Sequence, residues 1–101
     1  MRTDIIFRPE ADNDVEGAVA WYSSERVALG LAFIDNLDRV LLRIRERPLQ
    51  FPEVSMGVRR ALMARFPYGV FFKPVADEVV VFGVLHLHRS PKTWRSRVGS
   101  S

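Results

Sequence analysis

The spacing of apolar residues changes at Pro48, and this change constrains the fold more than any other feature of the chain. Between residues 9 and 47, apolar side chains recur at the period of an α-helix. After Pro48 they alternate or run continuously, as they do in β-strands. We therefore expect a pair of helices followed by a β-sheet, which is the organisation of an α+β domain.

The first half of the chain is expected to form two helices. Pro9 is well placed in the first turn of a helix, and the acidic residues after it lie near the positive end of the helix dipole. A break around residues 28–30 separates the helices, and Pro48 ends the second one. Each helix has one apolar stripe, so we expect an antiparallel hairpin with Trp21 and Tyr22 packed between the two helices. The stripes consist of Ala11, Val15, Ala18, Val19 and Tyr22 in the first helix and Phe33, Leu37, Val40, Leu41 and Ile44 in the second.

Four segments are expected to be strands: residues 4–8 before the helices, and residues 58–66, 70–73 and 79–87 after them. The last three form a three-strand antiparallel meander. The 79–87 segment is apolar on both faces and belongs in the sheet interior, so the first strand should pair beside it. The helical hairpin then covers one face of the sheet. We expect one domain over residues 1–97 and a frayed tail over residues 98–101.

Alternation along the 58–66 segment assigns its arginines to the two faces of the sheet. Arg60 falls on the side of the core, where we expect it to pair with an acid of the first helix, Glu10 or Asp14. Arg59 and Arg65 share the opposite face. They are expected either to contact an anionic target or to keep an uncovered face soluble.

Composition and motifs exclude several classes of protein. The chain has no cysteine, which rules out disulfides and thiolate zinc sites. His86 and His88 have no other metal-binding side chains clustered with them, and no nucleotide- or cofactor-binding motif is present, so we expect neither a metal nor a cofactor. No apolar run reaches the ~20 residues needed to cross a bilayer. The N-terminus does not resemble a signal peptide, and we expect a cytoplasmic protein.

The net charge of +3 is unevenly distributed along the chain. Residues 1–50 contain 7 Lys or Arg and 9 Asp or Glu, a net of −2, whereas residues 51–101 contain 8 and 3, a net of +5. Of the 15 basic residues 13 are arginine, a side chain suited to bidentate contacts with phosphates or carboxylates. One interpretation is a surface that faces a polyanion or an acidic partner. The other is a genome rich in arginine codons.

An ordered set of short motifs spans nearly the whole chain. The first half contains Pro9-Glu10-Ala11 with Asp14, Trp21-Tyr22, Leu29-Gly30 with Phe33, and Pro48 with Phe51-Pro52. The second half contains Arg59-Arg60, Phe66-Pro67-Tyr68, and Val84-Leu85-His86 followed by Arg89, Pro91 and Trp94. In this order they resemble the toxins of the RelE/ParE superfamily. The resemblance implies the fold inferred above and a small growth-arresting toxin that is neutralised by a cognate antitoxin.

Within that superfamily, two positions favour one branch over the other. RelE-like members cleave messenger RNA on the ribosome, typically with an arginine after the aromatic residue that Tyr68 matches and a tyrosine near the C-terminus. Here these positions hold Gly69 and either Trp94 or Arg95. The departure favours the ParE-like branch, whose members inhibit DNA gyrase by binding. A ribosome-dependent mRNA endonuclease is the alternative, and a non-catalytic interaction or nucleic-acid-binding module also stays open.

Candidate site residues follow from these alternatives. If the chain is a nuclease, the catalytic candidates are Arg65, His86 and Arg89. The candidates for target binding are Arg59, Arg65, Arg89, Trp94 and Arg95. Some of these residues could instead have purely structural roles. His86, placed by parity on one face with Val80, Phe82 and Val84, could be a half-buried histidine bonded to a backbone carbonyl. Trp94 could be a lid on the sheet edge.

The resemblance also implies the chemistry of the partner. Antitoxins of this kind are typically acidic and disordered in the segment that binds, and they fold on contact. They lay a helix on the toxin's helices and often a strand on an exposed sheet edge. A meander leaves at least one such edge. We therefore expect a toxin–antitoxin complex in which the antitoxin masks Arg59, Arg65 and Arg89 or their surroundings.

Overall fold

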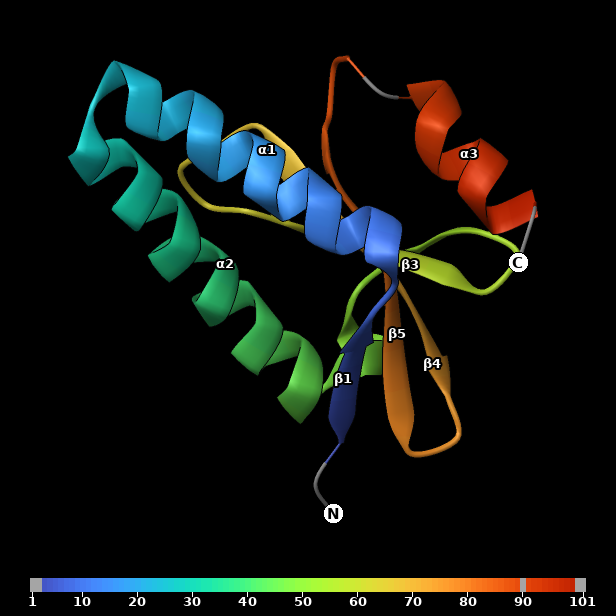
Figure 1. Ribbon diagram of the computed structural model, residues 1–101. Helices are drawn as coiled ribbons and strands as arrows, with labels where there is room; N and C mark the ends of the chain where they lie inside the picture. Colours follow the sequence, from blue (N-terminus) through green and yellow to red (C-terminus); the bar gives the residue numbers. More distant parts are fainter. Residues whose placement is uncertain (1–2, 90, 100–101) are drawn as a thin grey trace.

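A computed structural model of the chain describes residues 3–89 and 91–99. Two helices precede a set of strands, and a further helix ends the described chain (Figure 1). The elements are β1 (Asp4–Phe7), α1 (Pro9–Glu25), α2 (Val27–Glu46), a short 3-10 helix η1 (Pro48–Gln50), β2 (Glu53–Ser55), β3 (Val58–Leu62), β4 (Tyr68–Val75), β5 (Glu78–His86) and α3 (Pro91–Gly99). The predicted order of strand, helix, helix and meander is confirmed.

The five strands form one sheet in the order β1-β5-β4-β3-β2. The meander from β3 to β5 is antiparallel, as predicted. Strand β1 lies beside β5, as the apolar character of the 79–87 segment predicted, and the two strands are parallel. Strand β2 was not predicted. It is joined to β3 by Met56 and Gly57, whose φ angles of 48° and 84° are typical of a two-residue type I′ turn.

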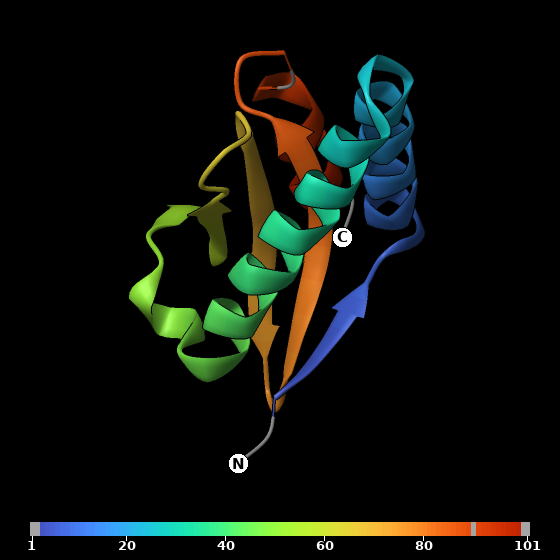
Figure 2. The ribbon, with the colours of Figure 1, turned by 90° about the vertical axis from the view of Figure 1, so that its left-hand side faces the viewer.

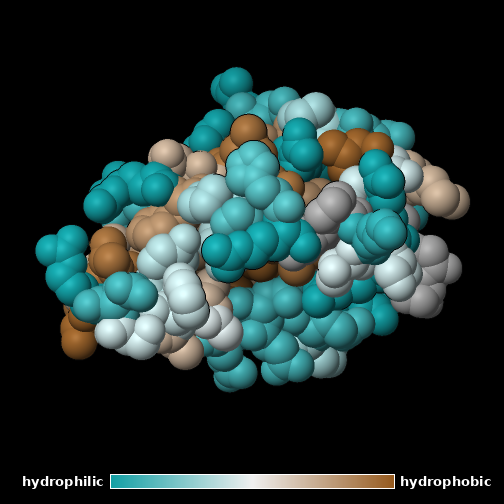
Figure 3. All heavy atoms as spheres, turned by 90° about the horizontal axis from the view of Figure 1, so that it is seen from above, coloured by the Kyte–Doolittle hydropathy of each residue, from teal (hydrophilic) through white to brown (hydrophobic). Residues whose placement is uncertain are grey.

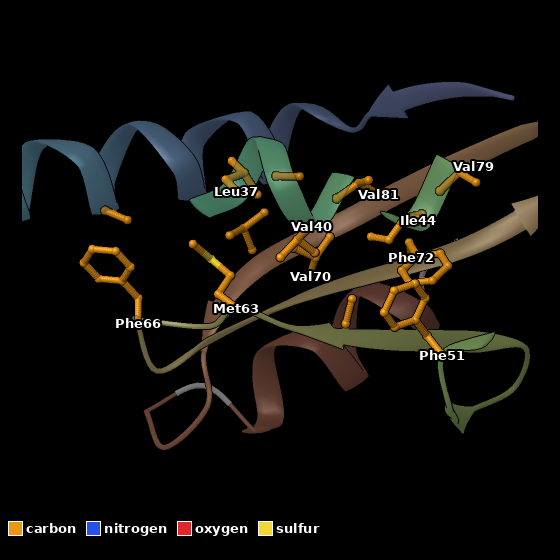
Figure 4. Packing of buried hydrophobic residues seen from close by; sticks show 14 of the residues in the cluster. Leu37, Val40, Ile44, Phe51, Met63, Phe66, Val70, Phe72, Val79 and Val81 are labelled. Atoms are coloured by element: carbon orange, nitrogen blue, oxygen red, sulfur yellow. The ribbon is translucent and has the colours of Figure 1, made fainter. Parts of the chain in front are cut away.

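Helices α1 and α2 cover one face of the sheet, as predicted, and α3 covers part of the other (Figures 2 and 4). The core between α1, α2 and the sheet contains Phe33, Ile44, Val70, Phe72 and Val81, all almost completely buried. Figure 4 shows the side chains of this core filling the layer between the helices and the strands. A smaller cluster on the α3 face consists of Val58, Phe71, Phe82, Leu85 and Trp94.

A close approach of the two helices fixes the hairpin. A Cβ atom on Gly30 of α2 would overlap the Ser23 Oγ of α1 and lie 3.1 Å from Ser23 Cβ and 3.3 Å from the Val19 carbonyl oxygen, so a larger residue would require Ser23 and the neighbouring helix to shift. The Tyr22 ring packs against the Phe33 ring at 5.7 Å between centroids, as expected. Trp21 does not pack between the helices: it is 56% exposed, and that part of the prediction was wrong.

A β-bulge in the β4–β5 pair changes which side chains of β5 face the helices. The register shifts from Phe71 opposite Gly83 to Phe72 opposite Val81, so one residue of β5 is left without a partner. As a result Phe82 joins the cluster on the α3 face, whereas Val84 joins the core under α1 and α2. The prediction that Phe82 and Val84 share a face was wrong because simple alternation cannot reveal a bulge.

The ion pair between Asp14 and Arg97 satisfies backbone groups next to the bulge. The Arg97 guanidinium donates to both carboxylate oxygens of Asp14, at 2.6 and 3.0 Å, and to the Phe82 carbonyl at 3.1 Å. The Val84 N–H donates to the same carboxylate at 3.1 Å. The hydrogen bond between Arg97 and Asp14 raises the pKa of Arg97. These contacts tie α1, β5 and α3 together.

The segment expected to leave the sheet as an irregular tail is a helix. Strand β5 ends at His86, and α3 begins at Pro91, where proline suits a first helical turn. Val98 and Gly99, expected to be frayed, belong to this helix, and Ser100 and Ser101 lie outside the described residues.

Candidate functional site

Four polar and aromatic side chains meet where β4 begins and β5 ends. Tyr68, the first residue of β4, lies opposite His86, the last residue of β5, and their rings are 5.3 Å apart. The His88 ring is 5.8 Å from the His86 ring, and Arg89 is close enough to affect the titration of both Tyr68 and His86. We call Tyr68, His86, His88 and Arg89 the strand-end cluster. Sequence reasoning identified His86 and Arg89 but missed Tyr68 as a member.

His86 lies on the helix side of the sheet and is half-buried, as predicted. Its hydrogen bond differs from the one expected: the Nδ1 atom accepts from the His88 backbone N–H at 3.2 Å instead of donating to a carbonyl. Burial lowers the pKa of His86 most, and the charges of Arg89 and His88 lower it further. The neutral ring is therefore favoured at physiological pH, with its proton on Nε2 because Nδ1 is an acceptor.

Tyr68 is packed against the core by aromatic neighbours. Its ring contacts Phe33 edge-on at 5.1 Å and lies 6.2 Å from the Tyr22 ring. Burial raises the pKa of Tyr68, as does Tyr22, whereas the Arg89 charge lowers it. The Tyr68 hydroxyl is therefore protonated at neutral pH and can donate a hydrogen bond to a ligand.

Arg65 lies at the same end of the sheet but not on a strand, because β3 ends at Leu62 rather than at residue 66. Its guanidinium carbon is 5.9 Å from the Phe66 ring, which packs on Tyr22 at 4.8 Å. The Arg65 N–H donates to the buried Asn36 side chain of α2 at 3.1 Å. Asn36 thus holds this turn against the helix, and the Arg65 side chain is exposed.

The remaining target-binding candidates lie elsewhere. Arg59 is on the helix side of β3, so the prediction that it lies on the uncovered face was wrong. Its guanidinium donates to the Phe51 carbonyl at 2.6 Å and to the Leu49 carbonyl at 3.4 Å. Trp94 is 9% exposed and stacks on Phe71 at 5.1 Å, on a face of the sheet rather than at its edge. Arg95 is exposed beside the Trp94 ring, 5.6 Å away. The structure therefore places Arg65, His86 and Arg89 at one end of the sheet, whereas Arg59, Trp94 and Arg95 contact other parts of the chain.

The prediction for Arg60 was wrong. Alternation with Val58, which belongs to the cluster on the α3 face, places Arg60 on that face and away from α1. Of the two acids that it was expected to pair with, Glu10 and Asp14, Asp14 pairs with Arg97 instead. The aliphatic part of the Arg60 side chain covers Gly69, whose missing Cβ would lie 3.2 Å from Arg60 Cγ.

An apolar groove between α1 and α2 was not predicted. It has a volume of about 730 Å³, and its apolar lining includes Val15, Ile34 and Leu41. The charged residues that line it are all acidic: Asp12, Glu16 and Asp38. Further hydrophobic residues are exposed at the start of α2, where Val27 and Leu31 are 70% and 64% exposed. Figure 3 shows hydrophobic atoms at several places on the surface, including the left end of the molecule in that view. The sequence did contain a sign of this groove: some apolar residues of the helices, such as Ile34, lie outside the predicted stripes.

Comparison with known proteins identifies the family. The family model described as "ParE toxin of type II toxin-antitoxin system, parDE" matches residues 5–91. The chain belongs to the ParE toxin family. A solved structure described as "Chromosomal ParDE TA system from P. aeruginosa" is similar in fold, with a TM-score of 0.75, 14% identity, and coverage of 85% of this chain and 97% of that one. The comparison with curated proteins finds no match.

Membership of the ParE toxin family agrees with the branch that Gly69 favoured in the sequence. In the structure a longer side chain at this position would require its neighbours to shift. A Cβ atom on Gly69 would lie 3.0 Å from Leu87 Cδ2, in addition to its contact with Arg60. Within residues 3–89 and 91–99, no group of three or more side chains could hold a metal ion, and no helix is long and apolar enough to cross a membrane.

Proposed function

We propose that this ParE-family toxin arrests growth in the cytoplasm by binding and inhibiting DNA gyrase, without cleaving nucleic acid. The observation that carries the proposal is the environment of Gly69. The arginine that RelE-like nucleases typically have at this position is absent, and the side chains of Arg60 and Leu87 would have to shift to admit one. The group that would stabilise a developing phosphate charge is therefore missing from this part of the sheet.

The state of His86 supports the same conclusion. A general base in RNA cleavage must accept the proton of a 2′-hydroxyl, and an acid must protonate the leaving oxygen. His86 Nδ1 already accepts the His88 N–H, and Nε2 carries the proton of the neutral ring. With its pKa lowered, His86 also holds little of the protonated form that an acid needs. The strand-end cluster is thus better suited to hydrogen bonding than to proton transfer.

A ribosome-dependent mRNA endonuclease is the second candidate, because Arg65, His86 and Arg89 do lie at one end of the sheet. In that case Arg65 and Arg89 would bind the phosphate, and the Tyr68 hydroxyl would take the place of the missing C-terminal tyrosine. Substitution of His86 and Arg89 should then abolish growth arrest. If the toxin acts by binding gyrase, the His86→Gln variant should keep most of its activity.

We further propose that a cognate antitoxin covers the groove between α1 and α2. The similar P. aeruginosa structure is described as a ParDE toxin–antitoxin system, which supports such a partner. The groove is apolar, and its charged lining residues Asp12, Glu16 and Asp38 are acidic. Charge complementarity favours an antitoxin helix with an apolar stripe flanked by Lys or Arg.

Induction of the chain in bacteria tests the proposed target. Gyrase inhibition predicts filamentation and activation of a DNA-damage reporter while incorporation of labelled amino acids continues at first. Rapid messenger cleavage with unchanged plasmid supercoiling would contradict it and would support the endonuclease. Co-expression with a small protein encoded next to the toxin should restore growth. As a control, an Asp12→Lys/Asp38→Lys variant should escape this rescue while it still arrests growth.

A further inference from the structure

Helix α2 has two long sides with different neighbours. Figure 2 shows α1 on one side of α2 and the segment from η1 to β3 on the other. The groove on the α1 side has only acidic charged lining residues. The side that faces away from α1 has the opposite charge and has no role in the function proposed above.

Two neighbouring pockets on this side share Arg43. The first has a volume of about 410 Å³, and its lining includes Arg39, Leu42 and Arg43. The second has a volume of about 280 Å³, and its lining includes Arg43, Arg60 and Leu62. Neither lining contains an acidic residue. We call Arg39, Leu42, Arg43, Arg60 and Leu62 together the outer α2 surface.

Two arginines of the outer α2 surface are not paired with an acid. Among the described residues, the ion pairs are Asp35 with Arg39 and Asp14 with Arg97, and neither includes Arg43 or Arg60. The Arg43 guanidinium carbon lies 5.3 Å from the centre of the Phe51 ring, which supports the cation from one side. A carboxylate of a partner would therefore meet a positioned guanidinium with no acid of this chain in competition.

The apolar part of this surface favours a protein as the partner. Leu42 and Leu62 are 54% and 52% exposed, and each lines a pocket together with Arg43. Exposed leucines are stabilised when another protein covers them. Contacts with nucleic acid are more polar, because they are made largely to phosphates and sugars. Arginine beside apolar side chains is instead typical of contacts between proteins.

The opposite charges on the two sides of α2 separate the partners that they fit. A helix flanked by Lys or Arg suits the acidic groove and is repelled by Arg39 and Arg43. An acidic protein surface suits the outer α2 surface and is repelled by Asp12 and Asp38 of the groove. Because like charges in contact oppose binding, the two sides select different proteins.

We propose that the outer α2 surface binds an acidic, partly apolar surface of the toxin's protein target. The Arg43 guanidinium pairs with a carboxylate of the target, and apolar side chains of the target cover Leu42 and Leu62. The inference rests on the proposed function in two respects: the antitoxin helix occupies the groove, and the target is DNA gyrase.

Binding of the full chain to purified DNA gyrase, measured by surface plasmon resonance, tests the inference. A Leu42→Gln/Arg43→Glu variant should bind at least about tenfold more weakly, because a central cation and an apolar contact are lost. Both residues are exposed, so the variant should keep the circular dichroism spectrum of the original chain. Arg26→Glu makes the same change of charge immediately before α2 and is the matched control, which should bind normally. Leu42→Gln alone should also weaken binding, which a contact with phosphates does not predict.

Photo-crosslinking tests the same surface without relying on the loss of a contact. A chain with benzoylphenylalanine in place of Leu42 should crosslink to a gyrase segment that is rich in Asp or Glu. The same group in place of Arg26 should give no crosslink. Crosslinks of equal yield from both positions, or crosslinks to DNA bound by gyrase instead of to the protein, would overturn the proposal.

The remaining outcomes separate this inference from the proposed function. Equal binding of gyrase by the original chain and the folded double variant refutes this inference alone. Loss of co-purification of the double variant with the small protein encoded next to the toxin would assign the surface to the antitoxin instead. If the original chain does not bind gyrase, the proposed target is wrong, and growth arrest decides the inference. The double variant should then fail to arrest growth, and full arrest would refute the outer α2 surface as the contact with any target.

Discussion

The Asp14–Arg97 pair should contribute a large part of the stability of the fold, and Arg97→Met tests this. Methionine keeps most of the aliphatic side chain but removes three hydrogen bonds, two to the Asp14 carboxylate and one to the Phe82 carbonyl. It also leaves the Asp14 charge with the Val84 N–H as its one remaining hydrogen-bond partner among residues 3–89 and 91–99. Loss of one member of a buried ion pair costs about 3–5 kcal/mol. Since Arg97 and Asp14 are 20% and 13% exposed, we expect the lower end of that range, about 3 kcal/mol.

Urea unfolding followed by circular dichroism measures this loss of unfolding free energy, and thermal unfolding gives the change in melting temperature. A change of about 3 kcal/mol should lower the melting temperature by about 15 °C in a domain of this size. Lys92→Met, on the exposed side of the same helix, is the control and should change stability by less than about 0.5 kcal/mol. In a double-mutant cycle with Asp14→Ala, the coupling energy should be about 2 kcal/mol. A loss below about 1 kcal/mol for Arg97→Met, or a coupling energy near zero, would refute this account of how α3 is held.

Three further changes should have effects that the structure specifies. Gly30→Ala should lower the free energy of unfolding by about 1–3 kcal/mol in a urea titration, because its Cβ would overlap Ser23, and an unchanged midpoint would contradict this. Because the pKa of His86 is lowered in the folded protein, unfolding takes up a proton, and stability should fall as pH drops from 7 through the unfolded-state pKa of about 6.5. His86→Gln should flatten that dependence, and an equal slope in both proteins would be the contrary result. Gly69→Arg should lower the melting temperature, because Leu87 lies where the new side chain would begin. This variant should also not cleave messenger RNA on ribosomes, and cleavage would contradict the argument from Gly69.

The hydrophobic pattern was sufficient to predict the hairpin and the meander because each of these elements buries a long, regular face. The helix stripe that contains Phe33 and Ile44 and the continuous apolar segment of β5 have few alternative structures. Strand β2 has only three residues, and its pairing depends on the positive φ angles of Met56 and Gly57. Helix α3 is rich in charged residues and is held mainly by one tryptophan and one ion pair, contacts that arise only in the folded chain.

The candidate site was predicted in part for a related reason. Arg89 and His86 were found because they follow a buried strand, where sheets often present functional groups. Tyr68 was missed as a member of the strand-end cluster because its contact with His86 depends on the register between β4 and β5. The faces of Arg59 and Arg60 were exchanged because Val58, expected on the side of the helical hairpin, packs in the cluster under α3. The bulge beside Gly83 changed the face assigned to Phe82, and the early end of β3 took Arg65 off the strand. Neither irregularity alters the local sequence pattern enough to be predicted.

The most direct test of the central claim is a supercoiling assay with purified DNA gyrase, relaxed plasmid and the full toxin chain. We predict that the toxin inhibits supercoiling in proportion to its concentration, and that His86→Gln inhibits equally well. A translation extract run in parallel should show intact messenger RNA at the same toxin concentrations. Normal supercoiling together with messenger cleavage that depends on His86 and Arg89 would contradict the account.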